Sequence, residues 1–225
     1  MTFISRRDLL KRVGAVAAAA PMTGALDLDR VTAGTAGDAA ADAMQAGTKR
    51  TALESFTAAE AELMDAIVAR LIPTDENGPG ATEAHAVRYI DRALGGALAG
   101  SRQAYSAGLA ALDRYAQSSR GAAFTKLSAT DQDSLLIDVE TGAATGFSGS
   151  SAVFFAMVLN HTHQGTFGDP YYGGNANYVG WDLLGYPGVR TMVSAADQQL
   201  LEKHDLKSNH KSAYEYDAFT KAGGR

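Results

Sequence analysis

Residues 150–164 of the chain read SSAVFFAMVLNHTHQ. From Ala152 to Leu159 this stretch is apolar almost all round, a pattern typical of a helix in the centre of a hydrophobic core. By composition, VFFAMVL is also a plausible buried strand, because periodicity does not separate the two for a short apolar run. The length of the stretch and its capped start favour a helix.

Four helices are expected before this one and one after it. Apolar residues at helical spacing, followed by proline or glycine, predict helices at about 57–72, 82–94, 101–119 and 129–141. A further helix begins near residue 195. No stretch alternates strongly between apolar and polar residues. We therefore expect an all-α protein, a compact bundle of about six helices.

One local pattern marks three of these helix starts. A hydroxyl three residues before an acid can accept from the acid's amide, and the acid can reach back to the cap amide. The pairs are Thr57 with Glu60, Ser128 with Asp131, and Ser194 with Asp197. Glu60 fits this capping box best, and an aspartate in its place gives a weaker version.

Helical periodicity is absent from about Gly165 to Arg190, which is long for a structureless loop in a compact domain. Residues 168–181, GDPYYGGNANYVGW, hold four glycines, three tyrosines and the only tryptophan. No strand precedes the glycines and no lysine follows them, which disfavours a phosphate cradle. Tyrosine and tryptophan are typical of binding hot spots, but a loop packed on its own side chains fits equally well. We expect one long, ordered, aromatic and glycine-rich loop.

Two sets of polar residues are candidates for catalysis or metal binding. His161 and His163, with Asp169 close behind, suggest a metal site or a general base. Residues two apart on a helix point roughly 200° from each other, so both rarely bind one ion, and helix-end packing is favoured. Asp75 and Glu76 are paired acids at a turn between helices, where an Asx turn at Asp75 is favoured over acid–base catalysis.

Composition excludes several classes of function. The chain has 225 residues, enough for one domain with a sizeable core, and a net charge of -5. There is no basic excess to displace counterions from phosphates, so nucleic acid is not an expected partner. The absence of cysteine excludes disulfides, thiolate metal sites and cysteine nucleophiles.

The N-terminus resembles a twin-arginine export signal. A weakly hydrophobic stretch follows at 13–20, too short for a stable membrane span. A basic amphipathic helix that stays in place is the alternative. We expect a signal peptide and flexible linker at 1–47 and a helical domain at 48–225. The residues that match the export pattern are Ser5, Arg6, Arg7, Leu9, Leu10 and Lys11.

Two longer segments carry a family resemblance. LIPTDENGPGATEAHAVRYID at 71–91 and NHTHQGTFGDPYYGGNANYVGWDLLGYPG at 160–188 resemble the gluconate 2-dehydrogenase subunit 3 family. These proteins are the small, or gamma, subunits of membrane-associated, flavin-dependent gluconate and sugar dehydrogenases. The resemblance covers about residues 55–190.

The resemblance implies a non-catalytic accessory subunit in the periplasm or cell envelope, without a cofactor or metal of its own. In that family, FAD belongs to a large subunit of the glucose–methanol–choline type, and electrons pass to haem c in a cytochrome c subunit. The signal would carry the folded large subunit through the twin-arginine translocase. The alternatives are a small histidine-dependent enzyme and a stand-alone envelope module that binds sugar. The predicted partner interface comprises His161, His163, Phe167, Asp169, Pro170, Tyr171, Tyr172, Gly173, Gly174, Asn175, Asn177 and Trp181.

Overall fold

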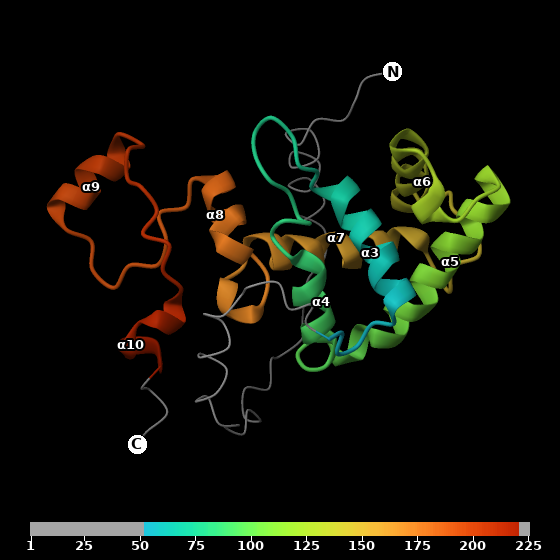
Figure 1. The fold of residues 1–225 in the computed structure, drawn as a ribbon, viewed down its shortest axis with the longest axis horizontal. Helices are drawn as coiled ribbons and strands as arrows, with labels where there is room; N and C mark the ends of the chain where they lie inside the picture. The colour runs from blue at the N-terminus through green and yellow to red at the C-terminus, as the bar shows by residue number, and fades with distance from the viewer. Residues whose placement is uncertain (1–51, 221–225) are drawn as a thin grey trace. The chain divides into compact units, whose positions relative to one another are not determined.

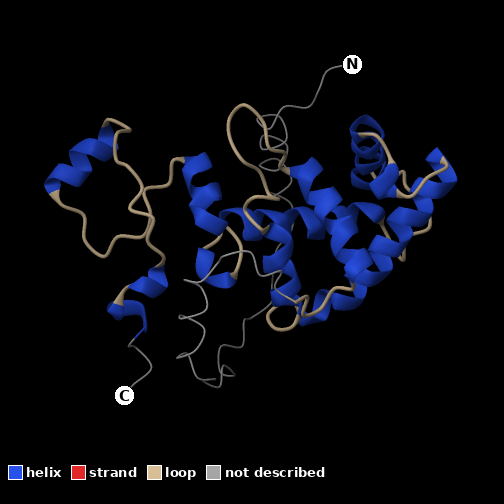
Figure 2. Ribbon diagram, viewed as in Figure 1, coloured by secondary structure: helices blue, strands red, loops and turns tan. Residues whose placement is uncertain are grey.

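The computed structural model describes residues 52–220, and those from Leu53 onward belong to one compact unit. These residues form helices and loops without a strand, apart from an isolated bridge between Asp75 and Gly78 (Figure 2). The predicted all-α class is therefore confirmed for them. The predicted signal and linker, residues 1–47, lie outside the described residues. Within 52–220, no helix combines the length and the apolar character needed to cross a membrane.

Every predicted helix is present (Figure 1). The long helices are α3 (Ala58–Leu71), α4 (Ala86–Leu94), α5 (Arg102–Arg120), α6 (Ala129–Glu140) and α7 (Ser151–Phe167). Three shorter ones follow, α8 (Val179–Leu184), α9 (Ala195–Glu202) and α10 (Asp217–Thr220). Short 3₁₀ turns lie at Ala99–Ser101, Phe124–Lys126, Pro170–Tyr172, Ala176–Tyr178 and Ala213–Glu215. The segment from about Gly165 to Arg190, which was predicted to be a loop, therefore holds two 3₁₀ turns and the whole of α8, a helix that the sequence did not predict. We call residues 168–181 the aromatic loop.

Two boundaries differ from the sequence prediction. Helix α4 begins at Ala86 and not near residue 82, because His85 takes a left-handed conformation with φ of 56°. A residue with that backbone cannot continue a right-handed helix. Helix α7 runs on to Phe167, so the segment without helical periodicity begins after the helix and not within its last turn.

Helix α7 is the central helix of the bundle, in contact with α3, α4, α5, α6 and α8. Its buried residues recur every three or four positions, as at Phe155, Val158 and Thr162. They form one face, as expected for this spacing. The opposite face is not covered by the described residues, and Val153 is 69% exposed. The helix is therefore central without being buried on every side.

The three predicted helix starts are confirmed as the starts of α3, α6 and α9. Thr57 with Glu60 and Ser194 with Asp197 form complete capping boxes. At α6, the Ser128 hydroxyl accepts from the Asp131 amide at 3.2 Å, and it also donates to that residue's carboxylate.

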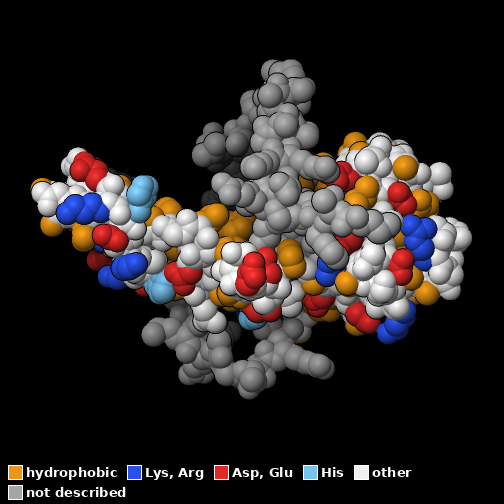
Figure 3. Space-filling view, turned by 90° about the horizontal axis from the view of Figure 1, so that it is seen from above, with side chains coloured by type: hydrophobic (Ala, Val, Ile, Leu, Met, Phe, Trp, Pro, Cys, Tyr) orange, Lys and Arg blue, Asp and Glu red, His pale blue; other side chains and the backbone are white. Residues whose placement is uncertain are grey.

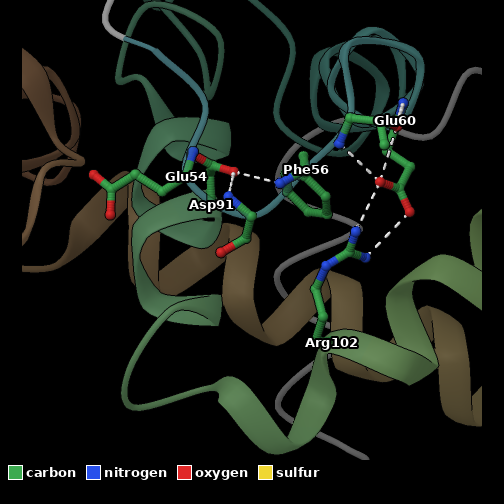
Figure 4. A network of polar contacts seen from close by, with 7 residues as sticks. Glu54, Phe56, Glu60, Asp91 and Arg102 are labelled. Atoms are coloured by element: carbon green, nitrogen blue, oxygen red, sulfur yellow. Dashed lines mark hydrogen bonds and ion pairs between the residues drawn. The ribbon is translucent and has the colours of Figure 1, made fainter.

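The chain segment before α3 is fixed by one buried carboxylate (Figure 4). Asp91 on α4 is 3% exposed and accepts hydrogen bonds from the amides of Glu54, Ser55 and Phe56 at 2.7–2.9 Å. A buried carboxylate is tolerated only with such donors. This arrangement holds the Phe56 ring in the core, edge-on to Tyr105.

A second carboxylate joins α3 to α5. Arg102 donates two hydrogen bonds to Glu60, at 3.1 and 3.0 Å (Figure 4). Burial raises the pKa of Glu60, but hydrogen bonds from Arg102 and Thr57 outweigh burial and hold the pKa at about 2. Because the pKa is lowered on folding, this stabilisation is complete above pH 4.5 and is lost as the pH falls toward 2.

Glu60→Gln should therefore reduce the free energy of unfolding at pH 7 by about 2 kcal/mol, the size of a hydrogen bond to a charged group. Urea denaturation at several pH values measures this difference, which should shrink between pH 4.5 and about pH 2. Glu62→Gln is the matched control, since Glu62 lies on the same helix with its side chain 66% exposed. A difference that did not depend on pH would contradict the assignment.

Candidate functional site

The site follows from the close backbone packing at the end of α7. Gly165 lies against α4, where a Cβ atom would sit 2.9 Å from the Ala86 carbonyl oxygen. A Cβ on Gly174 would overlap the carbonyl of Gly165, and one on Gly180 would overlap the carbonyl of Thr166. Only glycine permits such approaches of backbone to backbone. The glycines of this segment therefore serve helix packing.

Asn175 joins the end of α7 to the start of α8. It is completely buried, and its backbone amide donates to the Gly165 carbonyl at 2.7 Å. Its side-chain amide donates to the Gly168 carbonyl, and its side-chain oxygen accepts from the Gly180 amide, both at 2.8 Å. Its φ of 44° lies in the left-handed region, which asparagine tolerates better than most residues. Asn175 thus ties the loop to Gly165, Gly168 and Gly180.

Trp181 secures α8 on α7. The indole is 5% exposed and donates from Nε1 to the Phe167 carbonyl at 2.9 Å. The Tyr186 ring packs edge-on against it at 4.8 Å. Beside it lies a hollow of about 340 Å³, lined by Phe167, Asp169, Trp181, Leu184, Tyr186 and Val189.

Asp169 connects the loop to the C-terminal segment of the chain. It caps the turn that follows by accepting from the Tyr171 amide at 2.9 Å. The same carboxylate accepts from the Ser212 hydroxyl at 2.6 Å and from the Ala213 amide at 3.0 Å. Residues more than forty positions apart are therefore held together by one side chain.

Three tyrosines gather on this junction, and we call them the tyrosine patch: Tyr171, Tyr172 and Tyr214. The rings of Tyr171 and Tyr214 stack at 3.6 Å, and the hydroxyls of Tyr172 and Tyr214 lie 2.6 Å apart. That hydrogen bond and burial raise the pKa of Tyr214 to about 12. The three side chains are 47%, 49% and 37% exposed.

Tyr178 makes a second link to the C-terminal segment. Its hydroxyl donates to Glu215 at 2.9 Å, and its ring stacks on His210 at 5.0 Å. The backbone of Tyr178 has φ of 61°, which is strained for a large side chain. These contacts hold the residue in that conformation.

The two histidines of α7 point to different partners. His161 is buried, and its Nδ1 lies 3.0 Å from the Tyr105 hydroxyl. The His163 ring instead faces Phe167, with 6.1 Å between the two ring centroids. Burial lowers the pKa of both, which favours neutral rings. Asp169 is engaged by Ser212 and Ala213, as described above. Within residues 52–220, no group of three or more histidine or acidic side chains is placed to hold a metal ion.

The paired acids at residues 75 and 76 lie at a turn, as expected. Asp75 accepts from the Asn77 amide at 2.7 Å, so the predicted Asx turn is confirmed. The loop is closed further by Thr74, whose hydroxyl donates to Glu83 and accepts from the Gly80 amide.

The residues of the predicted interface differ in their exposure. His161, Gly174, Asn175 and Trp181 are buried in this chain and serve its own packing. Tyr171, Tyr172 and Asn177 are exposed, and His163, Phe167, Asp169, Pro170 and Gly173 are half-buried. No sequence pattern predicted a place at this site for Ser212, Tyr214 or Glu215. The pair Ser212 and Glu215 has capping-box spacing, but nothing local indicates that this turn meets Asp169.

Comparison with known proteins gave one family. Residues 58–188 match the family model described as gluconate 2-dehydrogenase subunit 3. The matched range runs from the start of α3 to just past α8, and so includes the whole aromatic loop. Neither the curated proteins nor the solved structures gave a significant match.

Gly180→Ala should displace α8, because the added methyl group overlaps the Thr166 carbonyl. Trp181 is the only tryptophan in the chain, so its fluorescence reports this displacement directly. We expect emission shifted to longer wavelength and a lower melting temperature. Gly96→Ala is the control, because a Cβ there meets nothing within 4 Å. Unchanged emission in Gly180→Ala would disprove the packing role of Gly180.

Proposed function

The chain belongs to the gluconate 2-dehydrogenase subunit 3 family, and on this basis we propose that it is a non-catalytic accessory subunit of a flavin-dependent gluconate or sugar dehydrogenase. The observation that carries the proposal is the family match over residues 58–188. Family membership makes the chain a subunit of a dehydrogenase complex, and a subunit needs a surface that is shaped for its partners.

The aromatic loop is the surface we propose for the large flavoprotein subunit, of the glucose–methanol–choline type. The polar side chains of the loop, above all Asp169 and Asn175, are engaged in bonds within the chain. They fix the backbone and leave the tyrosine patch exposed. Tyrosine offers a large contact area with few rotatable bonds, so a patch that is already ordered loses little entropy on binding. This geometry supports a role in recognition.

The chemistry of the complex is proposed to lie in other subunits. FAD would be bound by the large subunit, and haem c by a cytochrome c subunit that accepts the electrons. In this chain the two histidines of α7 take part in packing, His161 against Tyr105 and His163 against Phe167. That use of the two rings supports a structural role for the helix end.

We further propose that this chain exports and matures the large subunit. The twin-arginine route carries folded proteins, so the signal on the small subunit would take a folded, FAD-loaded partner to the periplasm. This part of the proposal depends on the residues that match the export pattern, which lie outside the described residues. They are Ser5, Arg6, Arg7, Leu9, Leu10 and Lys11.

Co-expression tests the accessory role. The flavoprotein subunit should reach the periplasm with FAD and dehydrogenase activity only when this chain is present. The readouts are FAD content and dye reduction in periplasmic extracts. Equal export and activity without this chain would refute the proposal. Activity of the purified chain alone would favour the small histidine-dependent enzyme.

Changing Arg6 and Arg7 to Lys together tests the export signal. Both this chain and the flavoprotein should then accumulate in the cytoplasm, measured by immunoblots of cell fractions. Arg50→Lys makes the same chemical change outside the motif and should leave export intact. Normal export of the double variant would rule out the twin-arginine route.

A further inference from the structure

Residues 190–207 form a projecting loop, which we call the finger. Its base is closed by backbone hydrogen bonds from Val189 to Lys211 at 3.2 Å and from Asn209 to Pro187 at 3.1 Å. Arg190 adds a bond from its guanidinium to the Lys207 carbonyl at 3.0 Å. The two ends of the finger are therefore held side by side by hydrogen bonds.

The finger carries α9, which lies apart from the other labelled helices in Figure 1, and none of its residues is buried by the part of the chain that the structure describes. A complete capping box at Ser194 starts the helix. A helix of only eight residues is nevertheless marginal in water unless it packs on something. The large apolar side chains of the finger remain exposed, at 85% for Met192, 61% for Val193, 43% for Leu200 and 51% for Leu201.

The charges of the finger favour a protein over a lipid surface as the occupant of this tip. Arg190, Lys203 and Lys207 are balanced by Asp197, Glu202 and Asp205. Figure 3 shows hydrophobic, basic and acidic side chains mixed at the left of the visible face, where α9 lies. Binding to an anionic membrane requires a basic excess or a much larger apolar face.

The size of the tip favours a partner that also makes other contacts. Four exposed apolar side chains offer roughly a few hundred Å², less than the about 800 Å² per partner of a stable interface. Two fingers pairing with each other would therefore be too small to hold a dimer. The finger base is linked to the tyrosine patch, because Ser212 and Ala213 bind Asp169 and Tyr214 stacks on Tyr171. One large partner can contact both surfaces.

We propose that the finger inserts Met192, Val193, Leu200 and Leu201 into an apolar groove of the flavoprotein large subunit, as a second contact beside the tyrosine patch. This inference rests on the proposed function. The finger also lies outside the family-matched residues 58–188, so it would be an attachment that the shared family core does not supply.

The experiment compares the affinity of full-length variants for the purified, FAD-loaded large subunit. Leu200→Ala with Leu201→Ala should weaken binding at least tenfold, and Met192→Ala with Val193→Ala should act similarly. Gln198→Ala with Gln199→Ala is the matched control, since it changes the same helix and removes only polar side chains. Circular dichroism and Trp181 fluorescence should be unchanged in all of them, because these side chains are exposed.

The outcomes separate this inference from the proposed function. Equal affinity of all variants, with the wild-type chain binding tightly, overturns the finger contact and leaves the accessory role in place. A wild-type chain that does not bind the large subunit overturns the accessory role itself. Two further outcomes would also overturn the inference. In one, the wild-type chain self-associates and the leucine variant does not. In the other, the wild-type chain binds vesicles of phosphatidylcholine and phosphatidylglycerol and the leucine variant does not. The finger would then serve a second copy or a membrane.

Discussion

The backbone at the end of α7 is approached by three other parts of the chain, and the rest of the site depends on this contact. Gly165 meets α4, Gly174 meets the carbonyl of Gly165, and Gly180 meets the carbonyl of Thr166. Asn175 supplies the hydrogen bonds that such a crowded, buried junction requires. Because no side chain separates these segments, the aromatic loop and α8 have little freedom to move. The glycines thus position the loop because they have no Cβ atom, which allows the backbone segments to lie in contact.

This constraint bears on the proposed binding surface, because it orders the polar and aromatic loop within the chain itself. Asp169, Asn175 and the Trp181 indole bind groups of the chain itself, so the backbone of the loop is set before any partner arrives. Left-handed residues at 175, 177 and 178 turn the chain sharply, and the contacts of Tyr178 stabilise that turn. The tyrosine patch is left outside. An ordered aromatic surface of this kind suits the proposed role of the chain as an accessory subunit.

The C-terminal segment at 212–214 completes the tyrosine patch, and no local sequence pattern predicts this contact. Asp169 accepts hydrogen bonds from Ser212 and Ala213, and the Tyr214 ring stacks on Tyr171. The family match ends at residue 188, before this segment. The tyrosine patch is therefore built partly from the shared family core and partly from residues outside the matched range.

The sequence by itself determined the long helices of the fold. Three kinds of local signal located every long helix: helix caps, apolar spacing and glycine stops. They act over three to seven residues and are therefore visible in the sequence. The caps are Thr57, Ser128 and Ser194. The Asx turn at Asp75 is of the same kind. Only the tertiary structure decided that Asp91 would bind the segment at 54–56, that His161 would face Tyr105, and that Asp169 would hold Ser212. These contacts join residues 35 to 56 positions apart. Their partners are selected by how the helices pack, and packing depends on the whole set of surfaces that the chain buries together.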